Sequence, residues 1–260
     1  MKISVITPVL NGERFIRQTV ESVLSQKGDF ELEYIIKDGG SMDGTLDILN
    51  KYTQHPAVTV VSQPDESLYD AVNQGFGHAT GDIGCWINAD DYYKSGAFQT
   101  AIRAFEKHPD RQWLYGRCDI VDDAENEIRK PVTWYKNLIG WRYSYKMLLC
   151  ENYINQPATF WKMNLWKQVG GLSLDYKITA DYHLWLKFAQ ETKAIALHKK
   201  LAHFRRCGES ISDNQFEQQF KEELEISNAF GSPFSKTIHR FNCWKITKSY
   251  HLLREKQKRI

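Results

Sequence analysis

Apolar runs of strand length alternate with amphipathic segments along the first 120 residues, and this alternation constrains the fold most strongly. The strand-length runs lie at residues 3–9, 33–37, 57–62 and 82–87, and the helix-length segments at 12–26, 44–52, 68–77 and 95–108. Such alternation is typical of a parallel sheet joined by right-handed crossovers and covered by helices on both faces. We therefore expect an α/β fold with a Rossmann-like, mostly parallel sheet.

The pattern becomes less regular after residue 120. Strands are expected at residues 113–120, 158–162 and 194–197, a helix capped by Thr179 at 180–191, and a long helix at 213–230 that ends before Pro233. We divide the chain into one half of a domain at 1–120, the second half of the same domain at 121–232, and a basic amphipathic C-terminal tail at 233–260 that forms a helical extension.

Charge is unevenly distributed along the chain. The net charge of +2 removes any case for nucleic-acid binding from bulk charge. Residues 236–260 nevertheless hold eight Lys or Arg and one Glu, whereas the other residues hold 26 Lys or Arg and 31 Asp or Glu, a net charge of −5. Two interpretations of the tail stay open. It forms a helix on an anionic membrane surface, or it packs Trp244 and its neighbours on the body with its charges solvated.

The cysteines and the apolar runs together indicate a cellular compartment. Five cysteines, far apart and without a CxxC pair, indicate neither a disulfide framework nor a zinc cluster. The first apolar run lacks a cleavage site, and no apolar stretch is long enough to cross a membrane. We expect a cytoplasmic protein, with peripheral contact to the inner face of the membrane as one use of the tail.

Acidic residues follow three of the strand-like runs. Asp38, Asp65 and the pair Asp90-Asp91 come where each run ends. Ligands of open parallel sheets bind at the carboxyl ends of the strands, so these acids are expected to share one cleft. Clustered carboxylates need a cation, and a divalent ion that also binds a diphosphate satisfies them. Asp38 and Asp65 also suit ordinary turns or caps, whereas two adjacent acids exceed what a cap needs.

Asp181 is the remaining candidate, in the first turn of the expected helix at 180–191. The helix dipole favours an acid there whatever the function. The apolar run Leu184-Trp185-Leu186 would anchor this helix in the core and hold its first turn rigidly enough for a general base. His183, nearby, is more often merely packed in such a setting.

Six blocks of sequence together resemble one known family. They are SVITPVLN at 4–11, DGGSMDGT at 38–45, QPDESLYDAVNQG at 63–75, GD at 81–82, NADD at 88–91 and TADY at 179–182. In order and spacing they resemble the family 2 inverting glycosyltransferases with the GT-A fold from bacterial polysaccharide and lipopolysaccharide gene clusters. The resemblance covers about residues 1–215, and it departs from the family at Ser67, where Gly is usual.

The resemblance implies a nucleotide-sugar donor bound by the first half of the domain. Pro8 and Val9 would line the base pocket, and Asn11 would belong to the same site. Asp38 would accept a hydrogen bond from the base, and Asp65 would contact the nucleoside. A UDP-sugar is the default donor, with a GDP-sugar still open because an Asp can also accept from guanine.

The resemblance also assigns metal and catalytic roles. Asp91 would bind a divalent cation, Mn²⁺ or Mg²⁺, and Asp90 would lie near the ribose. Asp181 matches the general base, and Gln156 resembles a residue near the donor sugar. Many relatives place a further His ligand after the base-bearing helix, and the sequence leaves open whether His203 corresponds to it.

These expectations define an inverting glycosyltransferase that moves a sugar to a hydroxyl of a glycan or lipid-linked acceptor in surface polysaccharide synthesis. Six of the eight tryptophans lie in the second half, where they suit either sugar rings or core packing. Two rivals stay open. A nucleotidyltransferase would need a Gly-rich loop for a triphosphate, and residues 8–13 are poor in Gly. A catalytically inactive nucleotide-sugar-binding or scaffold protein is the other.

Overall fold

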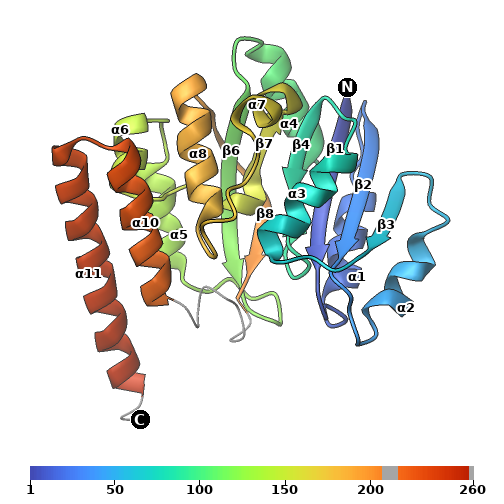
Figure 1. The fold of residues 1–260 in the computed structure, drawn as a ribbon, viewed down its shortest axis with the longest axis horizontal. Coiled ribbons are helices and arrows are strands. Elements are labelled where there is room, and N and C mark those ends of the chain that lie inside the picture. The colour runs from blue at the N-terminus through green and yellow to red at the C-terminus, as the bar shows by residue number, and fades with distance from the viewer. Residues whose placement is uncertain (207–215, 258–260) are drawn as a thin grey trace.

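The computed structural model describes residues 1–206 and 216–257. Within them, eight strands form a single sheet in the order β3-β2-β1-β4-β7-β6-β8-β5 (Figure 1). The strands are β1 (Lys2–Val9), β2 (Glu31–Asp38), β3 (Val58–Ser62), β4 (Ile83–Trp86), β5 (Tyr92–Tyr93), β6 (Trp113–Val121), β7 (Thr159–Lys162) and β8 (Ile195–Arg205).

Most neighbouring strands run parallel, as the alternation predicts. β1 pairs in parallel with β2 and β4, β2 with β3, and β6 with β8. β7 runs antiparallel to β4 and β6, and the short β5 runs antiparallel to β8. The chain order reverses at β1, between β2 and β4, so the carboxyl ends of these strands form the edge where ligands bind in such sheets.

Helices connect the strands and extend beyond them. They are α1 (Ile16–Leu24), α2 (Thr45–Leu49), η1 (Asn50–Tyr52), α3 (Leu68–His78), α4 (Ala97–Lys107), α5 (Lys130–Ile139), α6 (Tyr145–Cys150), η2 (Gln156–Ala158), α7 (Met163–Val169), α8 (Ala180–Glu191), α10 (Phe216–Phe230) and α11 (Pro233–Gln257). None of the described helices is both long and apolar enough to cross a membrane.

The two faces of the sheet carry separate cores because alternate strand residues point to opposite sides. Val5 and Ile36 join a cluster with side chains of α1 and α4, whereas Ile6 and Ile35 join a second cluster with side chains of α3, α7 and α8. Figure 1 shows α3 and α7 in front of the sheet and α1 behind it. The expected α/β architecture with helices on both faces is confirmed.

The less regular second half differs from the sequence expectations in three places. Helix α5 forms at Lys130–Ile139, where no helix was expected, and β8 continues to Arg205 rather than ending near residue 197. Thr179 precedes α8, but its side chain makes no cap hydrogen bond. Its hydroxyl donates to Glu222 instead, at 3.0 Å. Residues 213–215 of the expected long helix lie outside the described residues.

The C-terminal extension consists of α10 and α11, which lie side by side at one end of the sheet (Figure 1). The buried face of α11 carries Ser235, His239 and Cys243. Trp244 is 56% exposed, so the alternative in which Trp244 packs on the body is wrong, and α11 packs through another face. The membrane alternative stays a prediction. The division at residues 120 and 232 stays a prediction.

Candidate functional site

Strand register brings the expected donor-site residues to one edge. Val9 at the end of β1 lies beside Asp38 at the end of β2, and Asp38 lies beside Ser62 at the end of β3. Pro8 and Val9 are buried, and the Val9 carbonyl accepts a hydrogen bond from the Gly39 N–H at 2.9 Å. The carboxyl ends of three neighbouring strands therefore meet at this point.

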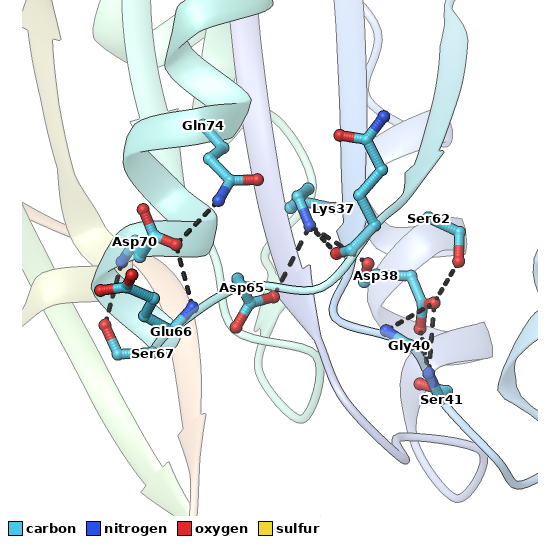
Figure 2. A network of polar contacts seen from close by, with 11 residues as sticks. Lys37, Asp38, Gly40, Ser41, Ser62, Asp65, Glu66, Ser67, Asp70 and Gln74 are labelled. Carbon is cyan, nitrogen blue, oxygen red and sulfur yellow. Dashed lines mark hydrogen bonds and ion pairs between the residues drawn. The ribbon is translucent and has the colours of Figure 1, made fainter.

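Asp38 is fully buried and organises the loop that follows β2 (Figure 2). Its carboxylate accepts hydrogen bonds from the N–H groups of Gly40 and Ser41 and from the Ser62 hydroxyl, the last at 2.7 Å. Burial alone would raise the pKa of Asp38, but these hydrogen bonds hold it below its usual value. Most of this carboxylate's accepting capacity is thus used by the loop itself.

Asp65 lies next to this loop and pairs with a buried lysine. The Lys37 ammonium is 3.6 Å from Asp65 Oδ2 and also donates to the carbonyls of Asp38 and Gln63 (Figure 2). A Cβ added to Gly39 would lie 2.5 Å from Asp65 Oδ2, so glycine permits the close approach. Burial raises the pKa of Asp65 against the opposing charge of Lys37. The Asp65 side chain keeps 13% exposure, which leaves part of it accessible at this edge.

Asn11 and Ser67 shape the loops around these acids. Asn11 has a positive φ of 52°, and its N–H donates to the Ser41 hydroxyl while its Oδ1 accepts from the Met42 N–H. Ser67 is the N-cap of α3, and its hydroxyl accepts from the Asp70 N–H at 3.2 Å. The serine that departs from the family's glycine therefore has a structural role, because it caps the helix that follows Asp65.

The adjacent acids Asp90 and Asp91 have different surroundings. Asp91 is fully buried, and its Oδ1 accepts from the Arg205 N–H at 2.8 Å, whereas Asp90 is partly exposed. Burial and the neighbouring Asp90 raise the pKa of Asp91 well above its usual value. One Asp91 oxygen is thus committed to the fold. Oδ2 is buried without a hydrogen-bond partner among the described residues.

Arg205 is the residue that holds this acidic turn, and no sequence motif pointed to it. Its guanidinium donates to the carbonyls of Asp90, Asp122 and Asp123 and to the side chain of Gln18. Its own exposure is 1%. The guanidinium also lies over the Phe15 ring, 4.3 Å from its centroid. This fork ties the end of β8 to the turn after β4 and to the loop after β6.

The oxygen atoms available at this turn suit a divalent cation. A buried carboxylate oxygen without a partner is costly to leave unsatisfied, and hard divalent ions take such oxygens as ligands. His203 lies opposite Tyr92 in the pairing of β8 with β5, and the two rings stack with centroids 4.4 Å apart. Burial lowers the pKa of His203, and its Nδ1 has no partner among the described residues.

Asp181 lies in the first turn of α8, as the sequence predicts, and is partly buried. Burial raises its pKa to about 6, against the opposing effects of the Tyr182 N–H, 2.7 Å from Oδ1, and of Lys136. The Tyr69 hydroxyl donates to the Ile178 carbonyl at 2.5 Å, which anchors the start of α8 to the helix that follows Asp65. A carboxylate with a pKa near 6 suits a general base.

Glu222 on α10 supports the same segment, although no sequence motif pointed to it. Its buried carboxylate accepts from the N–H groups of Lys177, Ile178 and Thr179 and from the Thr179 hydroxyl, at 3.0–3.2 Å. Burial would raise the pKa of Glu222, but these donors and Gln218 lower it. Glu222 therefore fixes the approach to α8 from a helix 43 residues away in sequence.

Gln156 and the tryptophans of the second half differ in how they are placed. Gln156 Nε2 donates to the Trp86 carbonyl at 2.7 Å, which places this side chain at the carboxyl end of β4. Of the six tryptophans in the second half, three are buried and three are about half exposed or more. The buried ones are Trp161, Trp166 and Trp185, and the exposed ones are Trp134, Trp141 and Trp244.

Comparison with known proteins identifies the class. The sequence matches the family model described as "Glycosyl transferase family 2" over residues 4–164, and the chain belongs to this family. It is 26% identical over 234 residues to a PGL/p-HBAD biosynthesis glycosyltransferase of Mycobacterium tuberculosis, which covers 88% of this chain and 86% of the relative. It is 23% identical to the chondroitin synthase of Pasteurella multocida, over 87% of this chain and 23% of that protein.

Solved structures share the fold. S. aureus TarS 1–349 in complex with UDP-GlcNAc superimposes with a TM-score of 0.69 at 18% identity, over 87% of this chain. The mannosyltransferase PcManGT from Pyrobaculum calidifontis, in complex with GDP-Man and Mn²⁺, gives 0.69 at 19% identity, over 93% of this chain and 69% of that one. The chain spans 66% of the TarS structure, just under two thirds. The expected GT-A fold and glycosyltransferase class are confirmed.

Proposed function

We propose that this chain is a metal-dependent, inverting glycosyltransferase that uses a nucleoside-diphosphate sugar, with a UDP-sugar as first choice. The acceptor is a hydroxyl of a glycan or lipid-linked saccharide in surface polysaccharide synthesis. Two fold neighbours support the donor class, since TarS was solved with UDP-GlcNAc and PcManGT with GDP-Man. This chain's own residues supply the rest of the support.

The observation that carries the proposal is that the acids form two separate groups. Carboxylates that follow β2, β3 and β4 gather at one sheet edge, and Asp91 Oδ2 has no partner there among the described residues. Asp181 begins a separate helix, with a pKa raised to about 6 by burial. Metal-binding acids and a distinct basic carboxylate are what a single-displacement transfer requires.

In the proposed mechanism, Pro8, Val9 and the loop held by Asp38 and Asn11 receive the base, and Asp65 contacts the nucleoside. Asp91 Oδ2 would hold Mn²⁺ or Mg²⁺, which would supply positive charge to the diphosphate leaving group, and Asp90 would lie near the ribose. Arg205 keeps this turn in place by donating to the Asp90 carbonyl and to Asp91 Oδ1.

The acceptor hydroxyl is activated on the side of the anomeric carbon opposite the diphosphate. Asp181 accepts the proton of the acceptor hydroxyl, whose oxygen forms a bond to the anomeric carbon while the bond to the diphosphate oxygen breaks. One displacement of this kind inverts the anomeric configuration. Gln156, fixed on the Trp86 carbonyl, would border the donor sugar.

A ligand screen tests the donor and metal assignments. We expect UDP with Mn²⁺ to raise the Tm of the wild type and not of Asp91→Asn, because a ligand at a hundred times its Kd adds about 2.7 kcal/mol. Asp110→Asn, which changes an exposed acid in the loop before β6, is the matched control. Stabilisation by GDP in place of UDP would reassign the base. No stabilisation by any nucleoside diphosphate would reject the transferase assignment in favour of a scaffold.

Product analysis separates the enzyme classes. A transferase releases a nucleoside diphosphate when the sugar moves, whereas a nucleotidyltransferase releases pyrophosphate from a triphosphate. An inactive binding protein does neither. NMR of the product's anomeric proton with an α-linked donor would show a β-linkage for inversion, and an α-linked product would contradict the single displacement.

The exposed face of α11 supports peripheral binding to an anionic lipid surface. Phe234, Phe241 and Trp244 are each more than half exposed, and Arg240 and Lys248 lie exposed on the same helix. Aromatic side chains among cations suit the interface of an anionic bilayer. The full chain should sediment with phosphatidylglycerol vesicles, and the double variant Phe241→Ser, Trp244→Ser should not. Equal sedimentation of both proteins would contradict the proposal.

A further inference from the structure

A second group of potential metal ligands lies away from the acidic edge, where α10 and α11 pack together (Figure 1). Glu223 on α10 and His239 and Cys243 on α11 place a carboxylate oxygen, an imidazole nitrogen and a sulfur within 4.8 Å of one another. All three residues are buried, with 1–5% exposure. His239 and Cys243 are four residues apart, so they lie on the same face of α11.

The orientation of His239 leaves one ring nitrogen for a ligand. Nδ1 lies 3.0 Å from the Leu149 carbonyl at the end of α6, so it carries the proton and donates it. Nε2 then faces Glu223 Oε2 at 3.9 Å, which is too long for a hydrogen bond. Metal-bound histidines characteristically donate their other N–H to a carbonyl in this way.

Glu223 is oriented in a similar manner. Gln219, one turn earlier on α10, donates to Glu223 Oε1 at 3.0 Å, while Oε2 is the oxygen directed towards His239. A carboxylate with 4% exposure is costly unless it is paired or binds a metal. The geometry is that of ligands already held by neighbouring groups.

We propose that Glu223, His239 and Cys243 bind a zinc ion, with water in the fourth position. A thiolate, an imidazole and a carboxylate are the ligand types that Zn²⁺ takes. Zinc bonds of about 2.0–2.3 Å place tetrahedral ligands about 3.3–3.8 Å apart, so the three side chains need to close by at most about an ångström. The ion would clamp α11 onto α10 and onto the end of α6.

The cysteine spacing, which indicates no zinc cluster, does not point to the proposed site. The ligands come from two helices, and only His239 and Cys243 are close in sequence. Absence of a CxxC pair therefore excluded only the clusters built on that motif.

Cobalt substitution tests the proposal on the full chain. After treatment with a chelator, titration with Co²⁺ should produce a thiolate-to-cobalt charge-transfer band in the near ultraviolet, which Zn²⁺ removes by displacement. The wild type and Cys243→Ala are both treated with chelator and then loaded with zinc. Elemental analysis should then find one more zinc per chain in the wild type than in the variant. Mn²⁺ bound by the carboxylates of the acidic edge would give no such band, because the proposed site there has no thiolate.

Matched variants assign the band. Cys243→Ala should abolish it, and Cys118→Ala, another buried cysteine on β6 near Asp91, should retain it. Glu223→Gln should weaken Co²⁺ binding at least about tenfold. Absence of the band from the wild type, or its survival in Cys243→Ala, would overturn the proposal. These results do not depend on glycosyl transfer.

Discussion

The two acidic regions of the site are held in place by opposite means. Asp38 is fixed by N–H groups two and three residues further along the chain, and Asp65 pairs with Lys37 one strand away. Asp91 is fixed by Arg205, 114 residues away, and the segment before Asp181 is fixed by Glu222. The proposed donor loops are thus held by residues of the first 70, Ser62 among them, whereas the proposed metal and base regions rest on the C-terminal part of the chain.

This difference determines how strongly a substitution in each region should change stability and activity. The loops at the ends of β1, β2 and β3 are held by several hydrogen bonds between neighbouring segments, so we expect single changes there to have small effects. Acids held by distant, buried partners depend on the packing of β8 and α10 against the sheet. We therefore expect the largest effects in the second region, at the acid itself and then at its partners.

The largest effect should come from Asp181→Asn, which removes the proposed base. General base catalysis contributes about 10²–10⁴-fold, so kcat should fall by that factor while the donor KM changes little. Because the carboxylate must be deprotonated to act, wild-type kcat/KM should rise with pH through about 6 and fall below it. The exposed Asp175→Asn serves as control. Retained activity in Asp181→Asn would exclude Asp181 as the base.

The same difference decides how much the sequence could predict. The parallel sheet, its helices and the acids after the strands follow from local patterns, because strand ends and turns leave a signature within a few residues. Arg205 carries no such signature. It lies at the end of β8, whereas the strand predicted from the sequence ended near residue 197. Its contact with Asp91 could therefore not be predicted.

The sequence also could not predict which of these polar side chains are buried and which partners they bind. Adjacent acids at 90 and 91 look alike in a motif, but the fold encloses Asp91 and leaves Asp90 partly exposed. Thr179 matches the pattern of a cap, yet its hydroxyl bonds to Glu222 because α10 packs there. Such choices depend on tertiary packing, which overrides local preference.

Arg205→Lys should have the next largest effect. Lysine keeps the charge but lacks the planar fork that reaches Asp122, Asp123 and Gln18. We expect about 2–3 kcal/mol less stability in urea unfolding, from buried donors lost to several acceptors, together with a higher Mn²⁺ requirement. Arg14→Lys, which alters an exposed ion pair with Asp123, should change stability by less than about 1 kcal/mol. Similar losses in both variants would contradict the special role of Arg205.

Glu222→Gln should act more weakly, through Asp181. The amide keeps the shape of the side chain, but it loses the charge and part of the accepting capacity for the residues before α8. We expect about 1–2 kcal/mol less stability and a kcat reduced by about tenfold.

A pH profile separates this role from simple destabilisation. The charge of Glu222 contributes to raising the pKa of Asp181, so its removal should shift the acidic limb of kcat/KM to lower pH. Glu225→Gln, exposed on the same helix, should leave that limb in place. An unshifted limb in Glu222→Gln would limit Glu222 to a structural role.

Ser67→Gly, in the locally built region, should have the smallest effect. It restores the residue usual in the family, and the helix loses only the cap bond from Ser67 to the Asp70 N–H. Replacing a serine N-cap by glycine costs a few tenths of a kcal/mol, because the backbone can still adopt the cap conformation and water can reach the N–H. Tm and donor KM should therefore remain close to the wild type, whereas Ser67→Val, which also removes the cap but stiffens the backbone, should lose about 1 kcal/mol. A large loss in Ser67→Gly would show that the donor loops depend on long-range support as well, and the contrast between the two regions would fail.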